Sequence, residues 1–287
     1  MKDRLHVAFV AKVLFVFMLL LSFYTCSERK HTEDNVQEES DEAVVEDSAD
    51  TQMPVSAEEL FDDFIFNFAS NRRLQMERVA FPLTVETDSF IKKVNHVKNK
   101  GRQVDRKQWR MEPFFMNQDY YTLLFDCQQQ QEQAKDTTVG SVVMERFFPD
   151  DDYVCRYFFE RNQGRWMLTK MHNQAFLRNA NASFISFYHR FVTDSIFQHQ
   201  SLGRRMQFTG PDPDDDFATM EGVITPDFWD AFKPWLPDVI NYNIVYGYQN
   251  PAATEKILVI RGIANGLEME LTFRLVKGRW LLEKLIT

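Results

Sequence analysis

The sequence has few of the residues that mark loops and linkers, because glycine and proline occur only 10 times each in 287 residues. It has no glycine-rich phosphate-binding loop, and no serine stands in the elbow pattern of a hydrolase nucleophile. Cysteine occurs three times and histidine six times, and no pair of them has the spacing of a zinc site. These absences exclude the familiar nucleotide, hydrolase and zinc motifs, so we expect neither a metal nor a cofactor.

Clustered positive charge is also absent. The formal net charge is −9, and ten acidic residues against two basic ones in residues 27–53 account for most of it. The chain from residue 54 onward is therefore close to neutral. Since nucleic-acid binding needs grouped Lys and Arg side chains, we expect no nucleic-acid partner.

Residues 1–26 begin with basic residues, continue as an apolar run and end on Cys26. The run has the length of a signal-peptide core and is short for a membrane-spanning helix. It resembles a bacterial lipoprotein signal, which implies lipidation of Cys26 and attachment to a bilayer in the cell envelope. Phe23 and Thr25 depart from the usual residues of that signal, and an ordinary signal peptide or an uncleaved anchor is the alternative. The acidic residues 27–55 are too polar to fold and predict a disordered tether.

Phenylalanine is abundant, with 27 copies, and much of it lies in a repeated pattern. GRWMLTKM at 164–171 returns as GRWLLEKL at 278–285. Phe61, Phe64, Ile65 and Phe68 have the i, i+3, i+4, i+7 spacing of a helix face, and the same spacing recurs 123 residues later from Phe184. We interpret the chain as two copies of one unit, the first repeat at 56–176 and the second repeat at 177–287.

Both repeats predict the same order of elements. A long helix comes first (57–70; 183–199), followed by a short strand, a shorter helix (105–116; 226–236) and four successive strands. Helices followed by an antiparallel meander indicate an α+β fold. The first repeat has a long, glutamine-rich loop at 127–138, which we interpret as a solvated hairpin. The second repeat has a shorter loop at 248–255.

The layout, with Gly-Arg-Trp opening each last strand, resembles the nuclear transport factor 2-like superfamily and uncharacterised Bacteroides lipoproteins that contain such domains. That resemblance implies two tandem cones, each a curved antiparallel sheet wrapped around helices. Because single-cone relatives often dimerise, it also implies an internal pseudo-dimer that is monomeric in solution.

Enzymes of this superfamily place an Asp or His base and a Tyr donor in the cone, and the resemblance makes Tyr121, Asp126, Glu145, Tyr157 and His172 the candidates for such roles. No fixed spacing selects a pair among them, and we assign no catalytic residue. Arg146 and Arg156 are suited to clamp an anion or, alternatively, to pair with carboxylates on neighbouring strands. The candidate pocket-lining set is therefore Tyr121, Asp126, Arg146, Arg156 and Tyr157.

Three functions stay open at this point. The preferred one is a non-catalytic, lipid-anchored envelope protein that binds a small apolar or amphipathic ligand or a protein partner. The alternatives are an enzyme of the ketosteroid isomerase or dehydratase type in one cone, and a structural part of an envelope assembly. Cys127 and Cys155 are expected on non-adjacent strands and therefore as free thiols.

Overall fold

The computed structural model describes residues 59–89, 91, 103–212 and 214–287. Cys26, the predicted signal segment and the acidic segment lie outside the described residues. Residues 52–287 form one compact unit. Within the described ranges, no helix has both the length and the apolar character that a membrane crossing needs.

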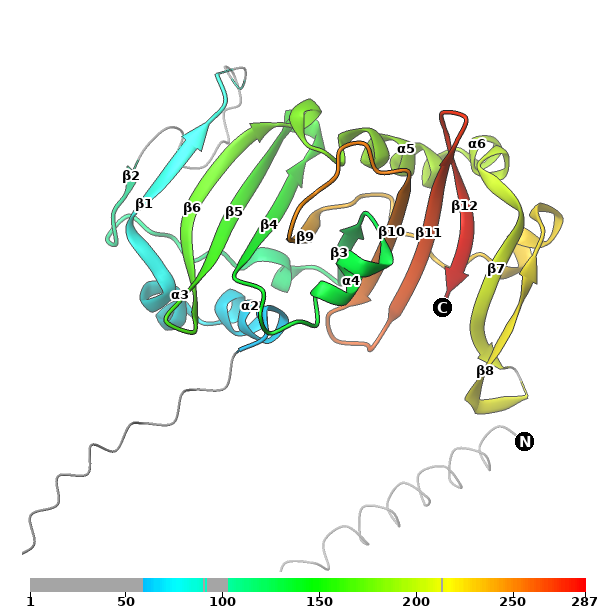
Figure 1. The fold of residues 1–287 in the computed structure, drawn as a ribbon, viewed down its shortest axis with the longest axis horizontal. Helices are drawn as coiled ribbons and strands as arrows, with labels where there is room; N and C mark the ends of the chain where they lie inside the picture. The colour runs from blue at the N-terminus through cyan, green and yellow to red at the C-terminus, as the bar shows by residue number, and fades with distance from the viewer. Residues whose placement is uncertain (1–58, 90, 92–102, 213) are drawn as a thin grey trace, which may run out of the picture. The chain divides into compact units, whose positions relative to one another are not determined.

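The described chain is α+β, as the sequence predicts (Figure 1). The helices are α2 (Phe61–Ser70), α3 (Arg72–Arg78), α4 (Gln128–Gln133), α5 (Ala182–Thr193), α6 (Ser195–Gln200) and α7 (Trp229–Phe232). The strands of the first repeat are β1 (Val79–Thr87), β2 (Gln103–Val104), β3 (Tyr120–Phe125), β4 (Ser141–Phe148), β5 (Tyr153–Asn162) and β6 (Arg165–Ala175). Those of the second repeat are β7 (Leu202–Asp212), β8 (Asp215–Ile224), β9 (Tyr242–Tyr246), β10 (Glu255–Gly262), β11 (Glu268–Val276) and β12 (Arg279–Ile286).

The long helix predicted at 183–199 is divided in two, whereas the one predicted at 57–70 ends at Ser70 and is followed by a second helix, α3, that the sequence did not predict. Asn71 and Asp194, again 123 residues apart, have extended backbone and separate α2 from α3 and α5 from α6. Each side chain accepts a hydrogen bond from a backbone N–H three residues on, Leu74 in one repeat and Phe197 in the other. These are N-caps, which stabilise a new helix start where the axis changes direction.

Two further predictions about local structure were wrong. The shorter helices expected at 105–116 and 226–236 are reduced to a 3₁₀ turn at Phe114–Asn117 and to a 3₁₀ turn that continues into α7. The loop at 127–138 is not a plain hairpin, because it carries α4. Gln130 of α4 is buried and accepts from the Asp126 N–H of its own repeat, while it donates to the carbonyls of Tyr246 and Tyr248 of the other repeat.

A buried glutamine follows the first helix of each repeat. Gln75 donates to the Phe68 carbonyl (2.8 Å) and accepts from the Trp109 indole (3.1 Å). Gln198 repeats this with the Phe191 carbonyl (3.0 Å) and the Trp229 indole (2.9 Å). Both satisfy a carbonyl at a helix end that would otherwise be buried without a donor.

The twelve strands make two curved, six-stranded sheets. One has the order β2-β1-β6-β5-β4-β9 and the other β3-β10-β11-β12-β7-β8. β1 runs parallel to β6, and β7 runs parallel to β12, while the other pairs are antiparallel. Taken from β2 in one sheet and from β8 in the other, the two orders correspond position by position. The last position is exchanged, because β9 of the second repeat ends the first sheet and β3 of the first repeat ends the second sheet.

This strand exchange joins the repeats. β9 of the second repeat pairs with β4 from Arg146–Tyr242 to Val142–Tyr246, and β3 of the first repeat pairs with β10. In Figure 1 the two strands cross the middle of the molecule, between the green and the red-orange sheets. Neither 56–176 nor 177–287 therefore supplies all strands of a sheet, and the boundary between them stays a prediction.

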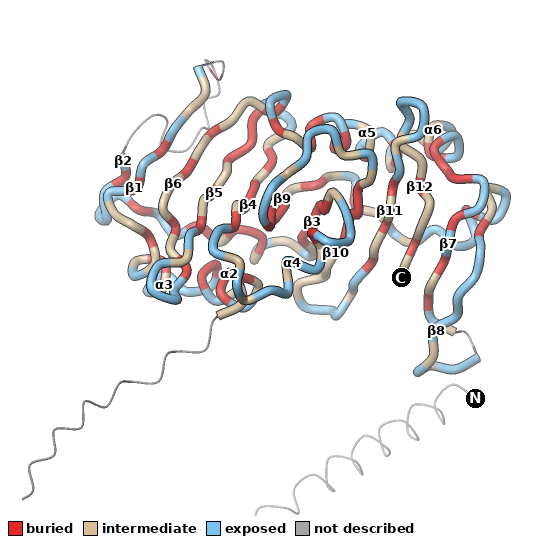
Figure 2. The backbone as a smooth tube through the Cα atoms, viewed as in Figure 1, coloured by how far each residue is buried: buried red, intermediate tan, exposed pale blue. Residues whose placement is uncertain are grey.

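The central strands face two hydrophobic cores. On β3, Tyr121, Leu123 and Phe125 belong to the core of the first sheet, whereas Leu124 belongs to the core of the second. β10 alternates in the same way. Figure 2 shows this as a run of buried backbone through the middle of the molecule. Side chains alternate across a strand, so a strand between two cores is apolar on both faces.

Side chains close the seam where β3 and β9 lie side by side. The Thr122 hydroxyl donates to the Tyr242 carbonyl, and the Asn243 side chain accepts from the Leu124 N–H at 2.7 Å. Strand edges expose unpaired backbone groups, and these two side chains satisfy groups that no neighbouring strand reaches.

A fully buried carboxylate, that of Glu145 on β4, anchors the seam. It accepts from the Asn179 amide (2.7 Å) and the Asn243 amide (3.1 Å), and its oxygen lies 3.1 Å from Arg156 Nε. The Arg156 N–H does not point along that line, so the contact is an ion pair and not a well-aligned hydrogen bond. A buried charge is tolerated only when it is paired and hydrogen-bonded, as Glu145 is.

We expect Glu145→Ala to lower the free energy of unfolding by about 3–5 kcal/mol, because it leaves Arg156, Asn179 and Asn243 without their shared partner. Urea unfolding followed by circular dichroism measures the change. Glu86→Ala is the control: the Glu86–Lys170 pair is largely exposed, and its loss changes stability by less than about 1 kcal/mol. Equal effects of the two substitutions would contradict the role given to Glu145.

Candidate functional site

Two of the five predicted pocket residues, Arg146 and Tyr157, form a cluster around Glu112 on the inner face of the first sheet. Arg146 Nη1 lies 3.0 Å from one Glu112 oxygen, and the Tyr157 hydroxyl donates to the other at 3.1 Å. Tyr157 is fully buried, and burial raises its pKa well above the ordinary value, so it stays a neutral donor. Both carboxylate oxygens of Glu112 thus already have partners inside the protein.

The cluster has no counterpart in the second repeat. At a displacement of 114 residues, Arg146 corresponds to Ile260 and Tyr157 to Leu271, and both of these are buried in the second core. Arg146 also lines a small cavity of about 230 Å³ together with Tyr242. The two repeats therefore share a frame but not an interior chemistry.

The other three predicted residues lie apart. Tyr121 is packed in the first core, where its ring stacks on Phe115 at 4.7 Å. Asp126 pairs with the buried Lys256 and lines an open cavity of about 520 Å³ beside α4. Arg156 pairs with Glu145, so it faces the seam. The structure does not bring the five residues to one pocket, and a shared role for them stays a prediction.

The remaining candidates have structural partners. His172 Nε2 lies 3.0 Å from Asp88 Oδ1 and ties the end of β1 to β6. Cys127 is exposed and Cys155 is buried, and neither forms a disulfide, as expected. Among the residues that the structure describes, no group of three His, Cys, Asp or Glu side chains is placed to hold a metal ion.

A different cavity has the properties of a binding site. It lies where α5 meets the turn after β4 and the segment before β9, and its volume is about 520 Å³. In Figure 1, α5 runs along the junction of the two sheets at this place. We call it the Tyr188 cleft. Its lining residues are Pro149, Asp150, Asp152, Phe176, Ile185, Ser186, Tyr188, His189, Asp238, Val239, Ile240 and Asn241.

Tyr188 stands out among the lining residues because its side chain is fully buried and its hydroxyl has no hydrogen-bond partner in the described chain. Burial, and to a smaller extent the nearby Tyr120 and Asp238, raises the pKa of Tyr188. An unsatisfied buried hydroxyl costs about 1–3 kcal/mol, and such groups in folded proteins call for an explanation.

The rim of the cleft is polar and acidic. Asp150, Asp152 and Asp238 are exposed there, and His189 Nδ1 lies 3.1 Å from the Asp238 carbonyl. The floor and walls, with Ile185, Ile240 and Phe176, are apolar. This arrangement disfavours an anionic ligand and suits a neutral or cationic molecule with an apolar body and one hydrogen-bonding group.

Sequence analysis did not find this site. The helix pattern placed Tyr188 on the apolar face of α5, where a core role is the ordinary interpretation. Neither residues 150–152 nor residues 238–241 carry a motif that indicates a binding site. The cleft exists because the strand exchange brings the segment before β9 next to the turn after β4, and nothing local in the sequence encodes that contact.

Comparison with known proteins supports the fold. The sequence family described as a domain of unknown function (DUF4348) matches residues 39–287. The crystal structure of an NTF2-like protein from Bacteroides fragilis is similar with a TM-score of 0.68 and 39% identity, over 82% of this chain and 98% of that one. No curated protein matches the chain. The NTF2-like α+β fold with two curved sheets is thus confirmed.

The unpartnered hydroxyl gives a test of stability. We expect Tyr188→Phe to keep or raise the free energy of unfolding, by up to about 1 kcal/mol, since it removes a buried polar group that has no partner. Tyr242→Phe is the matched control, because that hydroxyl donates to the Phe114 carbonyl at 2.7 Å. The control should lose about 0.5–1.5 kcal/mol. Equal losses in urea unfolding would show that Tyr188 has a partner within the protein.

Proposed function

The chain belongs to the DUF4348 family, a domain of unknown function, and we propose that it is a non-catalytic binding protein whose small amphipathic ligand occupies the Tyr188 cleft. The observation that carries the proposal is Tyr188, a lining residue of a mostly apolar cavity whose buried hydroxyl has no hydrogen-bond partner in the described chain. A cavity of about 520 Å³ falls within the range of small-molecule sites.

The ligand's hydrogen-bonding group would take the Tyr188 hydroxyl as a donor. Because its pKa is raised, this phenol stays protonated at neutral pH. Ligand binding then supplies the missing hydrogen bond and removes water from the apolar part of the cleft lining. The three rim carboxylates favour a neutral or cationic molecule over a fatty acid or a phosphate.

An enzymatic role in the first cone is the alternative, and its strongest candidate is the Glu112 cluster. A general base must reach a substrate proton with a free oxygen. Both Glu112 oxygens contact Arg146 or Tyr157, and the ring of Phe114 packs 4.9 Å from that of Tyr157. This packing supports binding over proton transfer at that position.

We also propose that the protein is anchored in the bacterial envelope through a lipid on Cys26 and works as a monomer. The lipoprotein-like residues 1–26 support the anchor, and the acidic residues 27–55 would give it reach. The exchange of β3 and β9 supports the monomer, because the pairing that joins two copies in a dimer is made here within one chain.

Ligand binding can be tested with Nile red, a neutral amphipathic dye with a carbonyl acceptor. We expect its fluorescence to rise in the presence of the full chain and Tyr188→Phe to weaken its binding about 2- to 10-fold, the equivalent of one hydrogen bond. Val239→Trp, which fills the cleft from a half-buried position, should abolish binding.

Tyr248→Phe serves as the control, since that ring is 81% exposed and lies outside the cleft. Native mass spectrometry of protein from its own host should show a neutral or cationic adduct that Val239→Trp lacks. Dye binding that is unchanged in both cleft variants would overturn the proposal.

Lipidation has its own test. We expect the host-expressed chain to carry a lipid mass and to sediment with membranes, and Cys26→Ser to lose both, because acyl chains supply most of the membrane affinity of a peripheral protein. Cys127→Ser is the control, as this exposed thiol lies in the folded unit. Membrane sedimentation that survives Cys26→Ser would exclude the anchor.

A further inference from the structure

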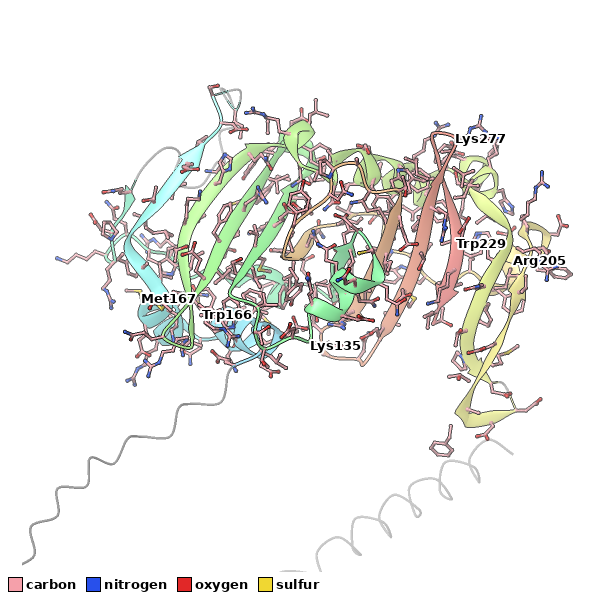
Figure 3. All side chains as sticks on the ribbon, viewed as in Figure 1. Lys135, Trp166, Met167, Arg205, Trp229 and Lys277 are labelled. Atoms are coloured by element: carbon pink, nitrogen blue, oxygen red, sulfur yellow. The ribbon has the colours of Figure 1, made fainter. Side chains whose placement is uncertain are left out.

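The two Gly-Arg-Trp motifs have different surroundings. In the first repeat, the Trp166 indole donates to the Glu59 carbonyl at 3.0 Å, and Arg161 donates to the same oxygen at 2.9 Å. Trp166 is only 1% exposed. In Figure 3 this residue lies beside the start of α2. A backbone segment that enters α2 in extended form therefore covers the first tryptophan.

The second motif lacks this cover. The residue that matches Glu59 at a displacement of 123 is Ala182, which already lies in α5, where its carbonyl accepts from the Ser186 hydroxyl at 3.0 Å. Trp280 is half-buried, and the structure records no hydrogen bond for its indole within the described residues. The carbonyl that satisfies the first tryptophan has no equivalent in the second repeat.

Beside Trp280, where the first repeat has the covering segment, the second repeat has an open cavity of about 650 Å³. This cavity lies next to the β11–β12 turn that carries Lys277 in Figure 3. We call it the Trp280 pocket. Its aromatic residues are Phe187, Phe197 and Trp280. The rest of the lining is Ala180, Ser183, Arg190, Gln200, Ser201, Pro251, Ala252, Ala253, Lys256, Leu275, Gly278 and Arg279. None of these residues lines the Tyr188 cleft.

The charge of the pocket has one sign. Its lining holds Arg190, Lys256 and Arg279 and no Asp or Glu, although the whole chain has a formal charge of −9. Lys256 already pairs with Asp126, and Arg190 lies 3.5 Å from Asp194 outside the lining. The exposed Arg279 has no ion pair recorded in the described chain, so it is the cation left to meet a ligand.

We infer that the Trp280 pocket binds an extended, acidic peptide segment of a partner protein. A backbone carbonyl of that segment accepts from the Trp280 indole, as the Glu59 carbonyl does at Trp166, and a carboxylate faces Arg279. The exposed Ser183 offers a hydroxyl group to a further backbone atom. In the first repeat a single glutamate makes both kinds of contact: the Glu59 carbonyl accepts from Trp166, and the Glu59 carboxylate lies 3.7 Å from Arg78.

The probe is an end-capped, fluorescein-labelled octapeptide of alternating glutamate and valine, titrated against the full chain by fluorescence anisotropy. We expect saturable binding that Trp280→Phe weakens about 2- to 10-fold, the loss of one hydrogen bond. Arg279→Gln should weaken binding by a similar factor and reduce its dependence on salt, because the lost contact is ionic.

Matched variants outside the pocket are Trp235→Phe, with a tryptophan 60% exposed, and Arg204→Gln on β7; both should bind like the natural chain. A peptide with glutamine in place of glutamate should bind more weakly. The inference is overturned if the glutamate peptide does not bind, if both pocket variants bind it unchanged, or if acetate at the same carboxylate concentration displaces it. The Nile red measurements on the Tyr188 cleft are independent of each of these outcomes.

Discussion

The structure depends on the seam between β3 and β9, two strands that each repeat gives to the sheet of the other. Their facing edges are not paired with each other, so Thr122, Asn243 and Glu145 must satisfy the backbone and charge buried there. A buried polar network is stable only when all of its members are bonded. The seam therefore holds the repeats in one register, and the cleft beside α5 follows from that register.

The two sheets have corresponding strand orders, and residues at equivalent positions of the two repeats are alike in some places and different in others. The glutamine that bonds a helix end to a tryptophan is kept in both, because each copy has the same helix terminus to satisfy. The Glu112–Arg146–Tyr157 cluster occurs in one copy, and a hydrocarbon core replaces it in the other. Trp166 is covered and Trp280 is open. Differences between equivalent positions thus point to function more directly than either copy does by itself.

The two proposed sites differ in charge, and the difference makes them separable. Carboxylates surround the Tyr188 cleft, whereas the lining of the Trp280 pocket contains only cations among its charged groups. Within the screening length of the salt solution, a cationic ligand is attracted to the Tyr188 cleft and repelled by the Trp280 pocket, and an anionic peptide shows the reverse preference. A binding protein with a neutral or cationic ligand and an acidic peptide partner could therefore hold both at once.

The sequence by itself determined the fold class, the apolar faces of α2 and α5 and the absence of a disulfide between Cys127 and Cys155, because these follow from local spacing and strand order. It did not determine the helix break at Asp194, since a capping residue inside an apolar pattern resembles a polar position on a continuous helix. Only the tertiary structure decided that β3 and β9 are exchanged, because either sheet offers them the same hydrogen bonds and a similar apolar surface. That choice, made by contacts about 120 residues apart in the sequence, placed Tyr188 beside a cavity and left its hydroxyl without a partner.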